Sequence, residues 1–180
     1  MQITLKPFGR SDFSRLIAWV KSPAFLLQWA GPIFNYPLDN VQLEKYINGS
    51  EENFFKRKIF KVIRTDTNEV VGHIELNDID EKNKSAALCR VLIGKPSLRG
   101  KGIGTQMVTR LLTIGFDHSG LHRIDLVVFD FNMAAINCYK RAGFTIEGHL
   151  RDARRLGDQY WSLYQMSILA PEWYLLMGKK

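Results

Sequence analysis

The sequence predicts an α/β protein with a mixed, mostly antiparallel sheet of six to seven strands and about four flanking helices. Residues 58–93 contain three strand-like runs separated by polar turns, which is typical of an antiparallel meander. The helical spacing over 103–116 is followed by a nearly continuous β-branched and aromatic run at 124–129. Such a run after a helix is expected of a central strand that is parallel to the strand before that helix. The length suits a single core, so we expect one domain over residues 1–180.

The N-terminal part is expected to be largely helical. Ser11 and Asp39 have the side chains preferred at helix N-caps, and Pro23 is expected to end the first helix. Four aromatic residues broken by a Gly-Pro pair predict an irregular or short helical segment over 25–36. The expected elements are a strand at 3–5 stopped by Pro7, a helix from 11 to 23, this aromatic segment, and a helix from 39 that carries Leu43, Tyr46 and Ile47.

The remaining elements alternate between strand and helix. Asn132 is expected to cap the second long helix and Gly143 to end it, while Pro171 is expected to close the last strand. In chain order we predict strands at 58–64, 70–76 and 86–93, a helix at 103–116, a strand at 124–129, a helix at 132–141, and strands at 144–150 and 160–169.

Composition narrows the classes of function. The formal net charge is +7 and the pI is about 9.5, which suits an anionic ligand, an acidic partner or nucleic acid. Basic residues are scattered rather than interleaved with aromatic residues on a sheet face, so a nucleic-acid binder ranks last. Two cysteines make neither a disulfide framework nor a zinc quartet, and no metal is expected. With no signal peptide or membrane span in the sequence, we expect a cytoplasmic protein with no membrane partner.

The most informative stretch is the segment 99–105, Arg-Gly-Lys-Gly-Ile-Gly-Thr, which we call the glycine loop. It lies between a predicted strand and a predicted helix. This arrangement presents backbone N–H groups to a phosphate, and Arg99 and Lys101 add positive charge. The alternating glycines differ from a dinucleotide fingerprint, and a P-loop context is absent. A glycine-rich turn before a helix can also be only a turn, so a second signal is needed.

That second signal follows the next strand. Asn132, Ala135, Ile136, Tyr139 and the pair 143–144 form an Asn-x-x-Ala-Ile-x-x-Tyr-x-x-x-Gly-Phe pattern. Together with the Arg-x-x-Gly-x-Gly-like loop before it, this resembles the GNAT superfamily of acetyl-CoA-dependent N-acetyltransferases. The segment 143–151 and the opening strand and helix are similar to the branch that includes ribosomal-protein N-terminal acetyltransferases. The resemblance spans most of the chain.

The resemblance implies a GNAT fold with a splayed parallel strand pair, and acetyl-CoA as the co-substrate. Its pyrophosphate would bind the glycine loop, and its pantetheine arm would lie along the preceding strand at a β-bulge. Glycines suit the loop because a Cβ would hold a phosphate away from the backbone. The residues expected to bind acetyl-CoA are Leu92, Ile93, Gly94, Arg99, Gly100, Lys101, Gly102, Ile103, Gly104, Thr105, Asn132, Ala135 and Tyr139.

Two catalytic groups are expected for the attack of a neutral amine on the thioester. The phenol of Tyr139 can donate a proton to the leaving sulfur, although it can also be a packed helix aromatic. Residues 85–98 contain no Asp or Glu, so Glu75 on the neighbouring strand is the nearest candidate base. An exposed, solubilising Glu75 is the more ordinary interpretation, and a water chain could also remove the proton. The four histidines show no ligand spacing and are expected to be structural or exposed.

The sequence leaves the acceptor open. We expect direct acetyl transfer to a primary amine, because Cys89 and Cys138 lack a recognisable nucleophile context. A protein N-terminus, an aminoglycoside and a polyamine all remain possible acceptors, and the branch resemblance tilts the prediction towards an N-terminal amine. Trp29, Phe34 and Tyr36 are candidates for the acceptor wall or for ordinary core packing. The alternative function is a non-catalytic acyl-CoA-binding sensor, and a homodimer is possible.

Overall fold

The computed structural model describes residues 1–52 and 57–178, and the side chains of 50–52 are left aside. Its strands are β1 (Ile3–Pro7), β2 (Arg57–Arg64), β3 (Val70–Asp80), β4 (Ser85–Ile93), β5 (Arg123–Phe129), β6 (Thr145–Leu156) and β7 (Gln159–Leu169). Its α-helices are α1 (Phe13–Trp19), α2 (Pro23–Ala30), α3 (Asn40–Glu52), α4 (Ile103–Leu112), α5 (Met133–Arg141) and α6 (Ala170–Leu176). Short 3-10 turns occupy Arg10–Asp12, Gly31–Ile33 and Pro96–Leu98, and the π-helical turn η4 spans Thr113–His118.

The seven strands form one sheet in the order β1-β2-β3-β4-β5-β7-β6. Every neighbouring pair is antiparallel except β4 and β5. This confirms the predicted mixed sheet and its parallel pair. The parallel strands pair only at Ser85–Arg123, Ala86–Ile124 and Ala87–Asp125. Beyond these three pairs β4 continues to Ile93 and β5 to Phe129, so the two strands separate towards their carboxyl ends.

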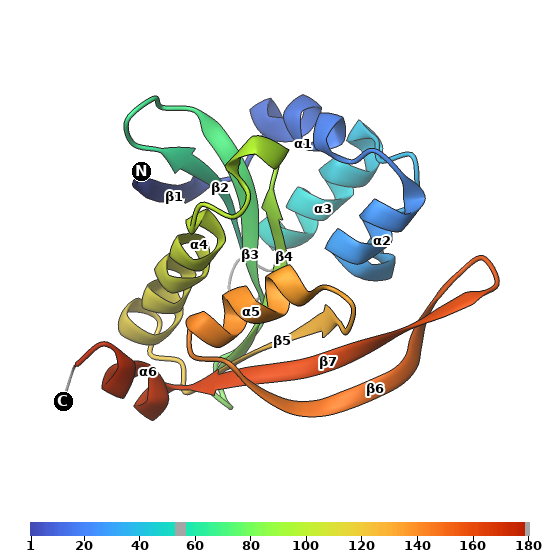
Figure 1. Cartoon of the computed structure of the whole chain (residues 1–180). Helices are drawn as coiled ribbons and strands as arrows, with labels where there is room; N and C mark the ends of the chain where they lie inside the picture. The colour runs from blue at the N-terminus through green and yellow to red at the C-terminus, as the bar shows by residue number, and fades with distance from the viewer. Residues whose placement is uncertain (53–56, 179–180) are drawn as a thin grey trace.

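Helices cover both faces of the sheet (Figure 1). On one face α4, α5 and α6 pack over a core that includes Met107, Ile124 and Trp173. On the other face α1, α2 and α3 pack over a second cluster that includes Leu43 and Leu92. Figure 1 shows α4 and α5 side by side, with α5 in front of the sheet and α2 to the right of it. The opening between β4 and β5 is therefore surrounded by helices from both faces.

Two of the three predicted N-caps, Asp39 and Asn132, are confirmed, whereas Ser11 lies within the Arg10–Asp12 turn and the N-cap of α1 is Asp12. Asp39 accepts a hydrogen bond from the amide of Gln42 at 2.8 Å, and Asn132 accepts one from the amide of Ala135 at 3.3 Å. The prediction that Pro23 ends the first helix was wrong, because α1 already ends at Trp19 and Pro23 is the first residue of α2. Ser22 caps that helix by accepting from the amide of Phe25 at 3.2 Å. Proline suits the first turn because its missing N–H would have had no partner there.

Other boundaries differ from the prediction at the ends of strands. β3 extends to Asp80 and β6 to Leu156, so both strands run into segments that looked polar. Pro171 follows the end of β7, as predicted, but it also lies in the first turn of α6, a helix that the sequence did not predict. Trp173 of α6 is buried. The extra residues of β3 and β6 are held in strands by pairing with neighbouring strands, and the residue pattern of one polar segment does not show that pairing. Within the described residues, none of the helices has the length and apolar character needed to cross a membrane.

Candidate active site

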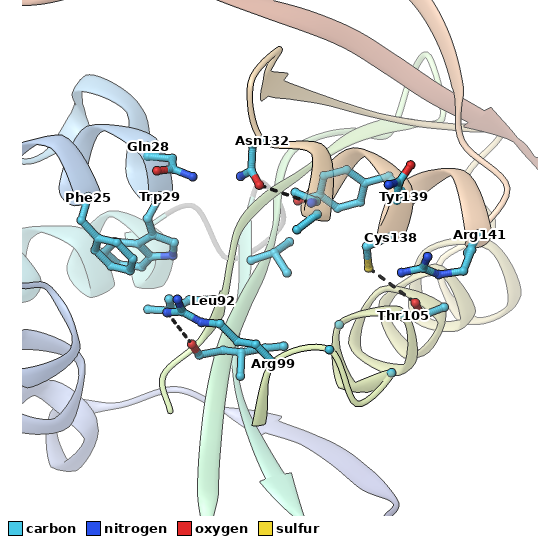
Figure 2. Close-up of a pocket in the computed structure, with 18 residues that line it drawn as sticks. Phe25, Gln28, Trp29, Leu92, Arg99, Thr105, Asn132, Cys138, Tyr139 and Arg141 are labelled. Atoms are coloured by element: carbon cyan, nitrogen blue, oxygen red, sulfur yellow. Dashed lines mark hydrogen bonds between the residues drawn. The ribbon is translucent and has the colours of Figure 1, made fainter. Parts of the chain in front are cut away.

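A cavity of about 450 Å³ lies between α2, the carboxyl end of β4, the glycine loop and α5 (Figure 2). It brings together residues that are far apart in the sequence. The predicted site residues in its lining are Leu92, Ile93, Arg99, Gly100, Gly102, Gly104, Thr105, Asn132, Ala135 and Tyr139. Four further predicted residues, Glu75, Gly94, Lys101 and Ile103, are not in the lining.

The glycine loop forms the polar end of this cavity. Gly100 and Gly102 have φ of +73° and +77°, the left-handed region that favours glycine. A Cβ built on either residue would meet no atom within 4 Å, so the space above the loop is open. Gly102 is the N-cap of α4 and its carbonyl accepts from the amide of Gln106 at 3.1 Å. The amides of the first helical turn before Gln106 therefore have no carbonyl partner in α4, and the helix N-terminus suits an anion.

Arg99 and Arg141 add positive charge to the same lining. The Arg99 guanidinium donates to the carbonyl oxygen of Ile93 at 3.3 Å, which links the loop to the end of β4. Lys101 is exposed outside the cavity. Two guanidinium groups beside an open helix N-terminus are a suitable environment for the phosphates of a nucleotide-like ligand.

Tyr139 lies on α5 at the other end of the lining (Figure 2). Its ring packs edge-on against Phe144 with centroids 5.9 Å apart, and only 8% of the residue is exposed. The hydroxyl makes no hydrogen bond to any other described residue, so it is free to interact with a ligand. Burial raises the pKa of the Tyr139 hydroxyl above its usual value near 10. The phenol is therefore protonated at neutral pH and can act as a donor.

The sequence of residues 24–144 matches the model of the GNAT acetyltransferase family. The chain belongs to the GNAT family. It transfers an acetyl group from acetyl-CoA to an amine, and the family resemblance expected from the two sequence motifs is confirmed. The relatives are named as enzymes, so the comparisons favour catalysis over the sensor alternative.

Relatives of this GNAT chain include a spermidine N(1)-acetyltransferase of Vibrio cholerae, which is 27% identical over 93% of both chains. A solved structure of a Vibrio cholerae spermidine acetyltransferase with CoA and spermine aligns with a TM-score of 0.81 at 26% identity, covering 96% of this chain and 98% of the other. A dodecameric structure of spermidine N-acetyltransferase from the same organism aligns with a TM-score of 0.77 at 25% identity and covers 99% of each chain. A Bacillus subtilis protein named provisionally as a ribosomal N-acetyltransferase is 30% identical over 57% of this chain and 55% of its own length.

Glu75 occupies a different place in this GNAT structure from the cavity lining. It is completely buried on β3, which overturns the interpretation of an exposed, solubilising residue. Its carboxylate accepts from the Tyr46 hydroxyl at 2.5 Å and pairs with Arg57 Nε at 3.1 Å and Arg90 Nε at 2.7 Å. Burial raises the pKa of Glu75, and the neighbouring Arg90 opposes that shift. Both carboxylate oxygens are therefore engaged within the protein.

The other predicted residues outside the lining have packing roles. A Cβ on Gly94 would stand 2.0 Å from the Trp19 ring, so glycine allows α1 to approach the end of β4. Ile103 is fully buried in the core beneath α4. His73 is buried beside Tyr46, whose hydroxyl lies 3.1 Å from His73 Nε2. Burial lowers the pKa of His73 to about 3, so this histidine is neutral, in agreement with a structural role.

Sequence reasoning missed part of the lining. Trp29 was a candidate for the acceptor wall and does line the cavity, whereas Phe34 lies in a separate smaller pocket and Tyr36 is exposed. Val91 also lines the cavity and belongs to the strand along which the pantetheine arm was expected to lie. The lining residues that no motif indicated are Phe25, Gln28, Ala134, Asn137, Cys138 and Arg141. The last four lie within the Asn132–Tyr139 motif or one turn beyond it, so helical periodicity could have found them. Phe25 and Gln28 come from α2, which had no motif of its own.

Proposed function

We propose that this enzyme acetylates a primary amine of an aliphatic polyamine of the spermidine type. The similarity to a spermidine acetyltransferase extends over almost the full length of both chains, and a relative with CoA and spermine has the same fold. The described part of the cavity lining contains no carboxylate. An unpaired ammonium group is costly to bury, so we expect the distal amines of the polyamine to stay in solvent at the cavity mouth.

In this proposal acetyl-CoA occupies the 450 Å³ cavity. The open space above Gly100 and Gly102 leaves room for phosphate oxygens, and the amides at the start of α4 are the donors. Arg99 and Arg141 pair with the phosphates, while Val91 and Leu92 contact the pantetheine arm. The side chain of Asn132 is engaged in capping α5, so its contribution is to hold that helix in place.

The chemistry requires two proton movements. The neutral amine nitrogen forms a bond to the thioester carbonyl carbon, and the bond from that carbon to sulfur breaks. The proton of the attacking nitrogen passes to water. The Tyr139 hydroxyl donates a proton to the leaving sulfur and is then reprotonated from solvent. No covalent enzyme intermediate is proposed, because burial raises the pKa of the Cys138 thiol and of the Cys89 thiol, the latter to about 12.

The observation that supports acetyl transfer at this cavity is the meeting of the glycine loop, the end of β4 and the free Tyr139 hydroxyl in one lining. The polyamine acceptor is inferred from the similarity to spermidine acetyltransferases over nearly the full chain. The test is thiol release from acetyl-CoA with a panel of spermidine, spermine, a monoamine of similar chain length, an aminoglycoside and a short peptide with a free N-terminus. We expect the largest kcat/KM with spermidine or spermine. A peptide preferred at least tenfold would overturn the polyamine proposal and support the ribosomal-type relative instead.

A second proposal concerns assembly. We propose that the chain associates with further copies of itself, because a relative of the same fold forms a dodecamer. Light scattering during size-exclusion chromatography tests this directly. A mass of 20.7 kDa at micromolar concentration would overturn it, since that is the mass of a single chain.

A further inference from the structure

The strand that lines the cavity is interrupted by a one-residue bulge. Cys89 of β4 pairs with Glu75 of β3, and Leu92 pairs with His73. Two residues of β4, Arg90 and Val91, therefore oppose a single residue of β3. The extra residue changes which side chains face each layer, as expected of a β-bulge.

The packing of β4 confirms this change. Before the bulge, Ala86 and Leu88 face the core beneath α4 and α5. Strict alternation would place Leu92 on that same face. Instead Val91 and Ile93 pack there, and Leu92 belongs to the cluster beneath α1, α2 and α3. The bulge therefore decides how residues 91–93 are presented to the cavity.

The bulge has an unfavourable backbone conformation. Arg90 has φ of +52°, in the left-handed region that non-glycine residues rarely adopt. Such a residue persists only when its surroundings hold it. Two contacts of Arg90, one through its backbone and one through its side chain, provide that restraint.

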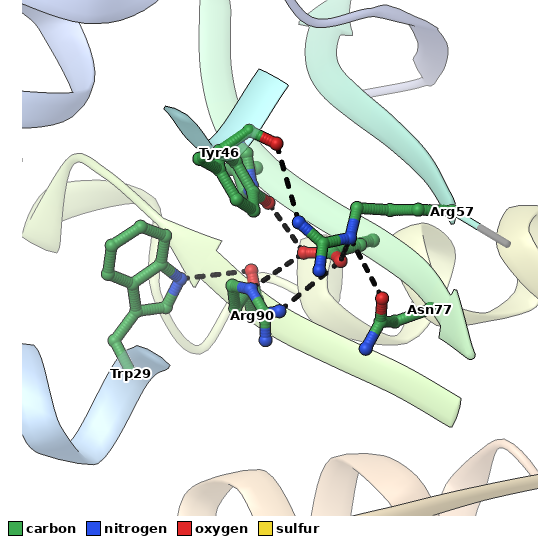
Figure 3. A network of polar contacts seen from close by, with 7 residues as sticks. Trp29, Tyr46, Arg57, Asn77 and Arg90 are labelled. Atoms are coloured by element: carbon green, nitrogen blue, oxygen red, sulfur yellow. Dashed lines mark hydrogen bonds and ion pairs between the residues drawn. The ribbon is translucent and has the colours of Figure 1, made fainter. Parts of the chain in front are cut away.

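The backbone contact comes from α2. The indole Nε1 of Trp29 donates to the carbonyl oxygen of Arg90 at 3.0 Å (Figure 3). The Trp29 side chain is itself part of the cavity lining. This hydrogen bond therefore links one wall of the cavity to the bulge in the opposite strand.

The side-chain contact lies on the buried side of the strand. Arg90 Nε is 2.7 Å from a carboxylate oxygen of Glu75, and its side chain is only 7% exposed. Arg90 and Arg57 also lie against the Tyr46 ring (Figure 3). Their guanidinium carbons are 5.6 and 5.3 Å from the centroid of that ring. Because Tyr46 and Arg57 also bind Glu75, the carboxylate is held rigidly from two further directions.

We propose that Trp29 and Glu75 clamp Arg90 and are positioning residues that fix the β4 bulge in the conformation required to bind acetyl-CoA. The inference rests on the proposed occupation of the cavity by acetyl-CoA. It assigns Glu75 a role through Arg90, because its oxygens are engaged by Tyr46, Arg57 and Arg90 and it lies outside the cavity lining. Loss of either contact lets the strained residue relax and turns the peptide groups of 91–93 away from the ligand.

The test compares two clamp variants with two matched controls. Trp29→Phe keeps an aromatic ring and removes the N–H donor, and Glu75→Gln keeps the shape and removes the charge. Trp173→Phe removes another buried indole N–H, which on α6 donates to Oδ1 of Asp117 in η4 at 3.1 Å. Asp12→Asn removes another buried carboxylate, which pairs with Lys61 at 3.0 Å. Neither control residue is in the cavity lining.

The readouts are the acetyl-CoA dissociation constant by calorimetry without an acceptor, and the separate kcat and KM values. We expect each clamp variant to weaken acetyl-CoA binding and raise its KM about five- to tenfold, with kcat at saturation changed less than about threefold. The controls should lower the melting temperature and leave binding within twofold. In the Trp29→Phe/Glu75→Gln double variant, we expect the acetyl-CoA dissociation constant to rise by less than the product of the two single-variant increases. The two effects overlap because both contacts hold the same residue, Arg90.

Two results would overturn the proposal. One is acetyl-CoA binding within twofold of the wild type in both clamp variants, which would leave the cluster with a purely structural role. The other is a Trp29→Phe effect confined to the KM of the amine, which would make Trp29 only an acceptor wall. The calorimetry contains no acceptor, so a wrong acceptor assignment does not affect it. Failure of the wild type to bind acetyl-CoA would refute both the cavity assignment and the clamp.

Discussion

Gly104 of α4 and Cys138 of α5 mark a close approach of the two helices beside the cavity. A Cβ built on Gly104 would stand 3.2 Å from Cys138 Sγ, closer than ordinary van der Waals contact. The neighbouring Thr105 hydroxyl lies 3.6 Å from the same sulfur. Glycine at 104 therefore sets the spacing of the two helices that carry the glycine loop and Tyr139.

This contact predicts a compensating pair of substitutions. Alanine inside a helix is more stable than glycine by about 1 kcal/mol, so Gly104→Ala should gain stability where space allows. In the wild-type background we expect that gain to be cancelled by the contact with Cys138. In a Cys138→Ala background Gly104→Ala should raise the free energy of unfolding by about 1 kcal/mol, measured by urea denaturation. Equal effects in both backgrounds would show that the sulfur does not limit the approach.

The glycine loop predicts a separation of stability from binding. Gly102→Ala places a Cβ in the open space above the loop at a residue with φ of +77°. Gly157→Ala in the β6–β7 turn is a matched control, because φ is +58° and its Cβ also meets nothing within 4 Å. Both should lose about 1 kcal/mol of stability through backbone strain. Only Gly102→Ala should abolish the rise in melting temperature that acetyl-CoA produces. Loss of that rise in Gly157→Ala as well would remove the case for a local phosphate site.

Tyr139→Phe tests the proton donor. Removal of the hydroxyl should lower kcat by about 10²- to 10³-fold, because general acid catalysis typically contributes that much. The acetyl-CoA dissociation constant should stay within a few-fold of the wild-type value, because the aromatic ring and its packing against Phe144 remain. Steady-state thiol release and calorimetry measure the two quantities. Tyr160→Phe, at an exposed position on the β6–β7 hairpin, is the control. An unchanged kcat in Tyr139→Phe would show that sulfur is protonated by another group.

The buried His73 predicts an acid-sensitive stability. Its pKa is lowered to about 3 in the folded state from 6.5, so between these values the unfolded chain binds a proton that the folded chain does not. The neutral His73 imidazole therefore costs the folded state nothing above about pH 6.5. As the pH falls from there towards 3, the free energy of unfolding decreases by up to about 1.4 kcal/mol per pH unit. His73→Gln should reduce this slope in urea denaturation between pH 6.5 and 4.5. The exposed His118→Gln is the control, and an unchanged slope in His73→Gln would contradict the assignment.

Much of the fold could be predicted because its signals are local. The alternation over 58–64, the caps at Asp39 and Asn132, and the strand–loop–helix order around the glycine loop depend on neighbouring residues. The elements that were missed or shortened obtain their stability from distant contacts. α6 is anchored by the burial of Trp173, and β6 extends to Leu156 because it pairs with β7. Residue patterns do not show such pairings.

The sequence by itself located the two segments that carry the glycine loop and Tyr139, because glycines and caps at fixed spacing specify local backbone geometry. The family and the acetyl donor followed from the resemblance of these two motifs to the GNAT family. Only the tertiary structure decided where Glu75 lies and what surrounds it. Residues of α3, β2 and β4 meet around its carboxylate, and the Trp29 indole reaches the Arg90 carbonyl across 61 positions of sequence. Burial and long-range hydrogen bonds, rather than residue type, therefore distinguish an exposed acid from the centre of a buried clamp.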